Sequence, residues 1–206
     1  MSDACGRTRW KRFAIVLASG VTAATALGIA MAQGALAASF FVSGQKFQIG
    51  ADTLTARGLS IYGMVDTPRK GAPVPVVVTG MRHAKIDGLC QSIVVPIPVL
   101  GTYTLRLTGD GGQAKAKDLF IDGTSLAADE ALLNDLDIGV AAGSLTTGKI
   151  NPDDRDSRFF DPNGIAQQAA SATLTDVRVT AIAVSAATLN VPGLNMRLLQ
   201  GNRSCF

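Results

Sequence analysis

The chain has 206 residues, and its 19 Lys and Arg against 16 Asp and Glu give a formal net charge of +3. Residues 1–38 hold four of the basic side chains and one of the acidic ones, which leaves 15 of each sign in residues 39–206. A segment without excess positive charge lacks the surface that displaces counterions from nucleic acid. The composition therefore predicts no nucleic-acid partner, and residues 39–206 have the length of a single domain.

The first 38 residues have the three parts of a secretory signal. They combine a positively charged start, an uncharged run rich in Ala, Val and Ile over 13–33, and small residues that allow cleavage between Ala37 and Ala38. The uncharged run, roughly twenty residues, is also long enough for an uncleaved membrane anchor. Both interpretations predict that 39–206 is exported, either secreted or held on the outer face of the cytoplasmic membrane in the cell envelope.

A six-residue pattern recurs along the exported segment: apolar, any residue, Asp or Gly, apolar, any residue, apolar. One of its six copies, 86–91, breaks the last position. The spacing between copies is uneven, which argues against a strict solenoid with one unit per turn. The copies span residues 56–61, 86–91, 116–121, 133–138, 174–179 and 191–196.

The spacing within this hexamer predicts bent strands. Side chains alternate between the two faces of a regular strand, so apolar residues three positions apart point to opposite sides. Asp and Gly tolerate the left-handed backbone of a bulge or corner, and one extra residue there returns both apolar side chains to the same interior. We therefore predict an all-β fold over 39–206, a curved and bulged sheet arranged as a sandwich or a solenoid-like domain after the N-terminal signal or anchor helix.

Local patterns predict further elements. Alternating apolar residues punctuated by glycine over 40–65 indicate two or three strands. The turn Gly109–Gly112 predicts a hairpin that joins 105–108 to 114–121. The segment 125–133 suits either two helical turns or a continuation of the strand pattern.

The most apolar stretch outside the leader is Cys90–Leu107. Pro96 and Pro98 exclude this stretch from the centre of a regular sheet and favour an edge or a loop. One interpretation is an apolar lip that contacts lipid or another apolar ligand, and the alternative is a bent strand buried in the core. The ligand-binding residues predicted on the first interpretation are Val94, Val95, Ile97, Val99 and Leu100.

Two cysteines, Cys90 and Cys205, remain after the leader, and an even pair in an oxidising compartment predicts a disulfide. On the chain-entropy model such a long loop is worth about 4 kcal/mol. The alternative is a pair of buried thiols. With no Cys-x-x-Cys motif and His83 as the single histidine, the sequence predicts no metal site and no cofactor.

Enzyme motifs are incomplete. Gly123–Ala127 comes within one residue of the nucleophile elbow of a serine hydrolase, but His83 precedes Ser125 and the surroundings have a strand pattern. Four aspartates in the loop 146–164 could hold Ca²⁺, yet they lack the spacing of an EF-hand. A solvated loop that ends in the turn Asp161–Gly164 is the preferred interpretation. We assign no catalytic residue.

Several stretches resemble one known family. FFVSGQKFQIGADTLTARGL, VPIPVLG and LTDVRVTAIAVSAATLNVPGLNMRL, followed by a near-terminal cysteine, are similar to the actinobacterial domain-of-unknown-function family 6230 over almost the whole chain. The resemblance implies a label of cholesterol esterase that some members carry, and a small integral membrane protein encoded nearby as a possible partner. The hexamer also resembles the strand pattern of bacterial groove-shaped lipid carriers, a likeness at fold level only.

These observations lead to three hypotheses. The first is a non-enzymatic cell-envelope protein that binds a lipid or another apolar ligand, or docks on a membrane partner. The second is a structural or assembly module with a filled core. The third is a lipid ester hydrolase, which lacks a recognisable catalytic set.

Overall fold

We describe a computed structural model of the chain at residue 10 and over residues 44–68, 72–97 and 99–206. The predicted leader, its cleavage site between Ala37 and Ala38, and Pro98 lie outside the described residues. None of the helices in the described ranges has the length and hydropathy of a membrane-spanning segment.

The fold is almost entirely β-structure, as predicted. Within the described ranges, the nine strands belong to one antiparallel sheet, and the connection before β8 holds one turn of 3₁₀-helix, η2 (Ala142–Ser144), and a short helix, α2 (Pro152–Arg155). The strands are β1 (Phe47–Asp66), β2 (Val74–Asp87), β3 (Cys90–Ile97), β4 (Gly101–Gly109), β5 (Ala114–Ala127), β6 (Glu130–Asn134), β7 (Asp137–Ala141), β8 (Ile165–Asn190) and β9 (Leu194–Gln200).

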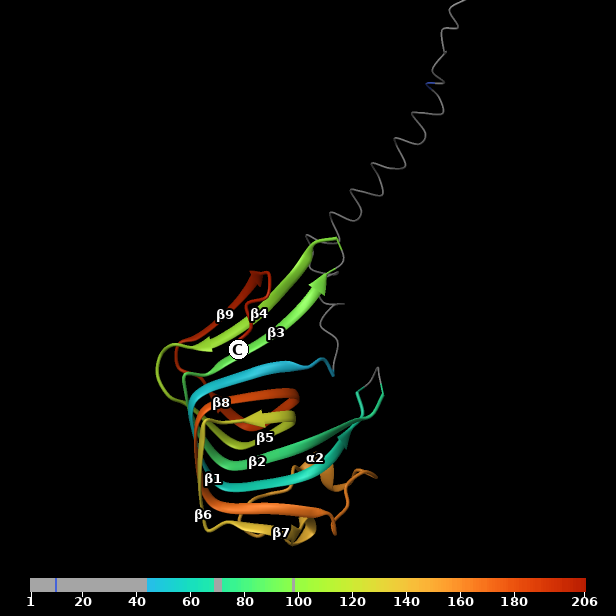
Figure 1. The fold of residues 1–206 in the computed structure, drawn as a ribbon, viewed down its shortest axis with the longest axis vertical. Coiled ribbons are helices and arrows are strands. Elements are labelled where there is room, and N and C mark those ends of the chain that lie inside the picture. The colour runs from blue at the N-terminus through green and yellow to red at the C-terminus, as the bar shows by residue number, and fades with distance from the viewer. Residues whose placement is uncertain (1–9, 11–43, 69–71, 98) are drawn as a thin grey trace, which may run out of the picture. The chain divides into compact units, whose positions relative to one another are not determined.

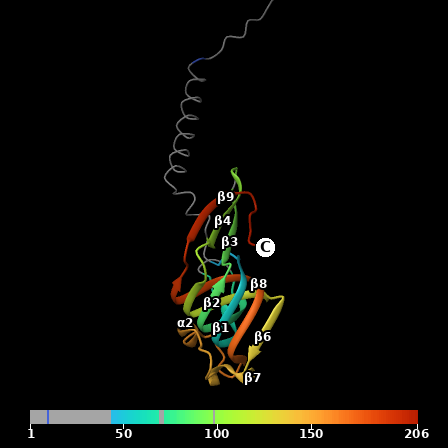
Figure 2. The ribbon, with the colours of Figure 1, turned by 90° about the vertical axis from the view of Figure 1, so that its left-hand side faces the viewer.

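The long strand β8 makes the sheet close on itself. One edge of β8 pairs with β1, the other edge pairs with β5, β6 and β7, and β2 joins β1 to β5. Strands β1, β2, β5 and β8 therefore form a closed ring (Figure 1). Strands β3, β4 and β9 extend the sheet beyond this ring, at the opposite end from β6 and β7 (Figures 1 and 2), and we call them the wing.

The Asp or Gly of every hexamer has a left-handed backbone, as the pattern predicted. Their φ angles lie between +45° and +66°, whereas most described residues other than glycine have negative φ. Left-handed conformations are costly for L-residues, and Asp accepts them better than most because its short side chain bonds locally. The six residues are Gly58, Gly88, Asp118, Asp135, Asp176 and Gly193.

These six residues fall into two rows that cross the sheet. In the first corner row, Gly58 and Asp118 both lie opposite Arg82, and Asp135 lies beside the position on β8 that faces Gly58. In the second corner row, Asp176 and Gly88 both lie opposite Asp52, and Gly193 continues the row by accepting a hydrogen bond from the Asp110 N–H (3.2 Å). Neighbouring strands therefore bend at the same level.

The corners return apolar residues to a common core. In four hexamers both apolar positions on either side of the corner are buried in the same cluster, although they are three residues apart. The other two hexamers depart from the pattern, because Leu136 and Leu194 are exposed. The four buried pairs are Ala56 with Leu59, Ile86 with Leu89, Ala116 with Leu119, and Leu174 with Val177.

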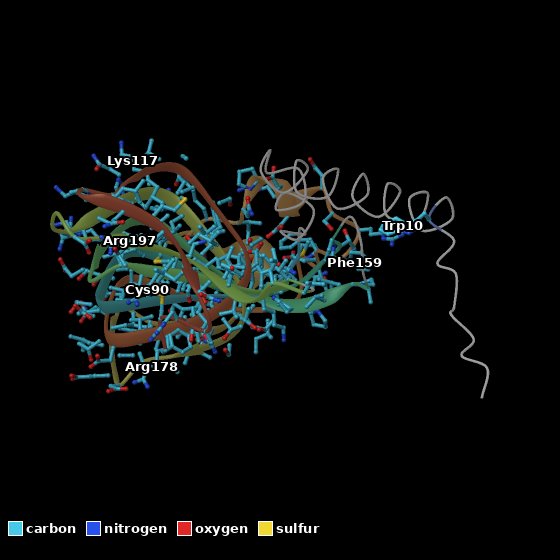
Figure 3. All side chains as sticks on the ribbon, turned by 90° about the horizontal axis from the view of Figure 1, so that it is seen from above. Trp10, Cys90, Lys117, Phe159, Arg178 and Arg197 are labelled. Atoms are coloured by element: carbon cyan, nitrogen blue, oxygen red, sulfur yellow. A yellow bond between two sulfur atoms is a disulfide. The ribbon has the colours of Figure 1, made fainter. Side chains whose placement is uncertain are left out.

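The interior of the ring is narrow, and small side chains, mainly alanine, fill much of it. Eight of the 18 residues in the main core cluster are alanine. A closed sheet with few strands leaves little interior space, so small side chains are needed where strands face each other closely. Charged side chains such as Lys117 and Arg178 lie on the outer surface (Figure 3).

The first corner row also anchors the long connection between β7 and β8. Arg82 Nε donates to the Thr147 carbonyl oxygen (2.7 Å), and Lys149 Nζ forms a salt bridge with Asp118 Oδ1 (2.6 Å). Ser60 Oγ donates to the Lys149 carbonyl oxygen (2.6 Å). Residues 146–149 are thereby held against the outside of the ring.

Three local predictions need correction. The glycines in 40–65 do not separate strands: β1 is one strand of 20 residues, and Gly58 is a corner inside it. The turn Gly109–Gly112 does not join paired strands, because β4 pairs with β3 and β9 while β5 pairs with β2 and β8. Of the two alternatives for 125–133, the strand is correct over the parts covered by β5 and β6.

The predicted disulfide is present in the structure. Cys90 and Cys205 are bonded, with Cα atoms 5.9 Å apart and a sequence separation of 115. Side chains of the wing hold the C-terminal segment as well: Ser92 Oγ accepts the Cys205 N–H (3.0 Å) and Thr104 Oγ1 accepts the Arg203 N–H (2.9 Å). The C-terminal segment is therefore packed on one face of the wing.

Replacing Gly58 by alanine tests the corner rows. The new Cβ would lie 2.7 Å from Arg82 Cδ and 3.0 Å from the Thr147 carbonyl oxygen, and φ is +66°. We expect Gly58→Ala to lower the free energy of unfolding by about 2 kcal/mol or more. Gly63→Ala is the matched control on the same strand, since nothing lies within 4 Å of its new Cβ. Urea denaturation of both variants checks this, and equal stabilities would contradict the assignment of Gly58 as an obligatory corner.

Candidate functional site

An apolar groove of about 210 Å³ lies where the ring meets the wing. Seven strands and two connections contribute to it, and ten of its eleven lining residues are apolar. Sites for apolar ligands are concave, mainly apolar and limited to a few polar groups. The lining residues are Ile49, Ile86, Leu89, Gln91, Leu107, Leu119, Ile121, Val184, Leu189, Val191 and Leu194.

The register of β5 and β8 explains one wall of the groove. Ile121 lies directly opposite Val184, and Ala116 lies directly opposite Leu189, so these side chains share one face of the sheet. On β5 this face belongs to the core, whereas Val184 and Leu189 are exposed. The core of the ring therefore opens to the surface along the second half of β8.

The wing extends this apolar surface. Ile93, Leu105 and Leu198 lie opposite one another across β3, β4 and β9, and Leu107 lies opposite Met196 in the next row on the same face. Leu198 and Met196 are both more than half exposed. One face of the wing is therefore apolar and continuous with the groove, since Leu107 also lines the groove.

The five ligand-binding residues predicted from the sequence lie elsewhere. They belong to β3 and to the turn between β3 and β4, and none of them lines the apolar groove. Val95 is 2% exposed and Val94 and Ile97 are half-buried, whereas Val99 and Leu100 are exposed at the turn. The structure thus divides the predicted lip into a buried strand and an exposed apolar tip.

Sequence reasoning missed the groove itself. Its signal was nevertheless present, because five lining residues occupy the two apolar positions that flank the Asp or Gly of a hexamer. These positions were interpreted only as core. The five residues are Ile86, Leu89, Leu119, Val191 and Leu194.

The structure does not bring a hydrolase set together. His83 on β2 lies opposite Lys117 of β5, and Ser125 lies eight residues further along β5. At up to about 3.3 Å per residue, this separation has an upper bound of roughly 25 Å, which the corner at Asp118 and the bulges before Ser125 shorten. Both side chains are exposed, so the pair offers no activated nucleophile.

An acidic pocket of about 300 Å³ lies on the outer face of the ring, beside the connection between β7 and β8, and is lined in part by Asp66, Asp122 and Asp154. Tyr62 Oη donates to Asp154 Oδ2 (2.7 Å) and accepts the Asn151 N–H (2.9 Å). These bonds fix the short helix α2 to the sheet. Asp154 is therefore a buried structural acceptor, and the preferred prediction of a solvated loop over 146–164 is wrong at this residue.

Asp122 is a buried residue of this pocket with an incomplete set of hydrogen bonds. It is 9% exposed and shares a hydrogen bond with Asp66, and its Oδ1 has no partner among the described residues. Burial first, and then the charges of Asp66 and Asp154, raise the pKa of Asp122 to about 7. Burial also raises the pKa of Asp66. Two carboxyl groups in contact share a proton because both cannot ionise cheaply.

No group of three or more His, Cys, Asp or Glu side chains within the described ranges is arranged to hold a metal ion. Four acidic residues line the pocket, but Asp153 is exposed and Asp154 already accepts the bond from Tyr62. The chemistry that the arrangement supports is the storage of one proton between Asp66 and Asp122.

The raised pKa of Asp122 predicts a loss of stability with increasing pH. Between the usual carboxyl pKa of 3.8 and a pKa of about 7, the folded state holds a proton that the unfolded state has released, so the free energy of unfolding falls as pH rises. We expect Asp122→Asn to be more stable than the wild type at pH 8, by on the order of 2–4 kcal/mol, and no more stable at pH 4.

Thermal or urea denaturation of Asp122→Asn from pH 4 to pH 8 measures this difference. Asp153→Asn is the control, because Asp153 lines the same pocket but is exposed. A wild-type stability that is flat over this range, or an equal gain in the control, would show that Asp122 is not a buried protonated acid.

The geometry can now be compared with known proteins. The model of a family of unknown function, DUF6230, matches residues 43–206, which cover all nine strands, the groove and the acidic pocket. No curated protein and no solved structure matches the chain. The family match confirms the resemblance drawn from the sequence. The chain therefore belongs to the family of unknown function DUF6230.

Proposed function

We propose that this protein is an exported, non-catalytic component of the cell envelope that binds the acyl chain of a lipid in the apolar groove. The observation that carries the proposal is the groove itself, where the core of the ring opens to the surface between ten apolar side chains. Apolar surface of this kind is unfavourable in water unless a ligand or a membrane covers it.

The size of the groove favours a chain over a bulky ring system. Its volume of about 210 Å³ is below the range of roughly 300–1,000 Å³ that encloses a drug-sized ligand. A segment of an acyl chain is narrow, and the remainder can follow the apolar face of the wing past Met196 and Leu198. A sterol ester exceeds this space, which argues against esterase activity at the groove.

The tip between β3 and β4 supports a contact with a membrane or a small membrane protein. Val99 is 105% exposed with φ of +70°, and Leu100 beside it is also exposed. A β-branched residue in a left-handed conformation is strained, and its full exposure adds an unfavourable apolar contact with water. Because Val99 combines backbone strain with an exposed apolar side chain, its conformation does not serve the stability of the domain and favours contact with a membrane or a partner protein.

Export rests on the predicted leader and is supported by the disulfide. Cys90 and Cys205 are bonded, and stable disulfides are typical of proteins outside the cytoplasm.

A structural or assembly module is the second candidate. The narrow interior of the ring favours it, because alanine side chains make up much of the core between β1, β2, β5 and β8. The two candidates differ at the groove, which is an accessible ligand site only in the first.

Binding of cis-parinaric acid, a fluorescent long-chain fatty acid, tests the first candidate. We expect its fluorescence to rise on addition of the full-length protein. Leu189→Asp should weaken binding at least tenfold, because a carboxylate at the rim must lose water when the chain enters. Leu189 is 51% exposed, so the substitution is compatible with folding.

Leu132→Asp is the matched control. Leu132 is 58% exposed on β6 and does not line the groove. We expect its affinity to stay within twofold of the wild type. No fluorescence increase with the wild type, or the same loss in both variants, would reject the lipid site and leave the structural module.

A further inference from the structure

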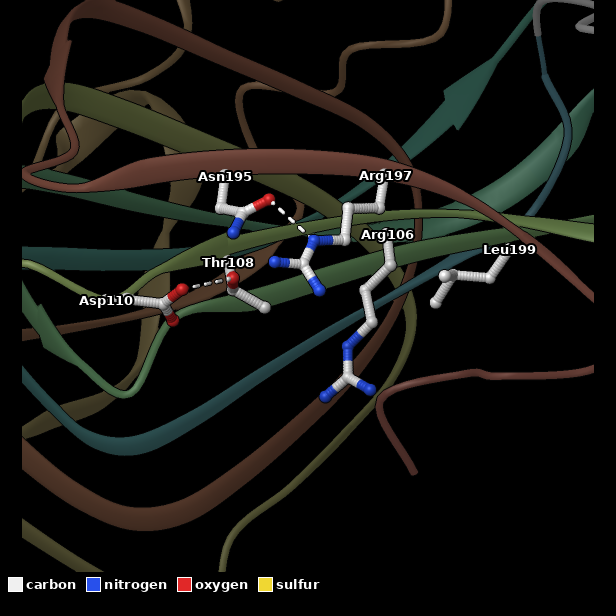
Figure 4. A pocket seen from close by; sticks show the side chains of 6 residues that line it. All are labelled: Arg106, Thr108, Asp110, Asn195, Arg197 and Leu199. Atoms are coloured by element: carbon white, nitrogen blue, oxygen red, sulfur yellow. Dashed lines mark hydrogen bonds between the residues drawn. The ribbon is translucent and has the colours of Figure 1, made fainter.

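The face of the wing opposite the apolar one carries two arginines side by side. Arg106 on β4 lies directly opposite Arg197 on β9. Together with Thr108, Asp110, Asn195 and Leu199 they line a pocket of about 190 Å³ (Figure 4). Like charges directly opposite each other destabilise a sheet, so this pair needs an explanation.

Neither arginine has a close ion-pair partner within the described ranges, although Asp52 and Asp176 line a neighbouring pocket together with Arg106. Arg106 Nε is buried and lacks a hydrogen-bond partner among the described residues. No salt bridge to Arg106 or Arg197 occurs within the described ranges. The carboxylate of Asp110 accepts from Thr108 Oγ1 (3.3 Å) and forms no salt bridge with either guanidinium group within the described ranges (Figure 4).

The neighbouring side chains direct donors toward the same space. Arg197 Nε donates to Asn195 Oδ1 (3.1 Å), which fixes the guanidinium and leaves the Asn195 NH₂ group available as a further donor. The guanidinium groups of Arg106 and Arg197 lie on the same side of β4 and β9 (Figure 4). Planar N–H pairs of this kind match the oxygen atoms of a phosphate group in geometry and charge.

We propose that Arg106 and Arg197 form a binding site for a phosphate group, with Asn195 as an additional donor. A bound phosphate neutralises the repulsion between the two guanidinium groups. The site is independent of the acyl-chain groove, because the register places it on the other face of the wing. Either a soluble phosphate or a phosphate in a lipid headgroup supplies this chemistry.

The experiment compares these two sources with the full-length protein. One arm titrates inorganic phosphate at constant ionic strength, with sodium chloride as the reference, and follows binding by calorimetry. The other arm measures sedimentation with vesicles of phosphatidylcholine, with and without phosphatidic acid. Binding of inorganic phosphate alone identifies a soluble phosphate, and binding only to phosphatidic acid vesicles identifies a lipid headgroup.

Substitutions decide whether the arginine pair is responsible. We expect Arg106→Gln and Arg197→Gln each to weaken binding at least tenfold in the arm that gives a signal. Arg197→Lys keeps the charge but loses the paired N–H donors. We expect its binding affinity to lie between those of the glutamine variants and the wild type. Because Arg197 is exposed, both of its variants are compatible with folding.

Arg57→Gln is the matched control, because it also removes one positive charge. Arg57 is exposed on β1 and does not line this pocket. Its affinity should stay within twofold of the wild type. Absence of binding in both arms, or an equal loss in Arg57→Gln, would overturn the proposal.

Discussion

The left-handed backbone at six Asp and Gly residues is the constraint on which the rest of this structure depends. A regular strand cannot direct apolar residues three positions apart into one interior. The corner at each hexamer removes that conflict, and the alignment of corners across neighbouring strands lets the whole sheet bend at two levels. Ring closure by β8, the alanine-rich interior and the position of the wing follow from these bends.

The same bends create the groove. Leu89 and Leu119 each follow a corner residue, Gly88 and Asp118, and each lies in the core while also lining the groove. The pairing of β8 with β1 reaches Ala181. Beyond this residue, β8 pairs within the ring only with β5. The interior face of β8 is then open to the surface at Val184 and Leu189.

The sequence predicted the backbone corners at Asp and Gly, but it did not predict which strands pair or where the groove forms. The dihedral preference of Asp and Gly is a local property, so the corners could be predicted from the hexamer alone. The groove could not, because its lining comes from seven strands and two connections, and long-range contacts decide which of these strands pair. Gly58 shows why local prediction fails here. A glycine within an apolar pattern is compatible both with a turn that ends a strand and with a corner inside one strand. The turn Gly109–Gly112 suggested a hairpin for the same reason, since turn chemistry does not determine which strands pair.

The two faces of the wing have different chemistry. Leucine and methionine on one face continue the groove, whereas Arg106 and Arg197 on the other face lie beside the C-terminal segment that the disulfide holds. The alternation of side chains along β9 produces this division, with Leu194, Met196 and Leu198 on one side and Asn195 and Arg197 on the other. An edge strand with this pattern separates an apolar surface from a cationic one.

Backbone NMR of the isotopically labelled full-length protein tests the central claim most directly. In a left-handed residue the amide proton lies close to its own α-proton, so the intraresidue cross-peak is stronger than in extended residues. The account predicts strong intraresidue peaks at Asp118, Asp135 and Asp176, each surrounded by weak ones along its strand. Weak peaks at these aspartates, equal to those of their extended neighbours, would contradict it.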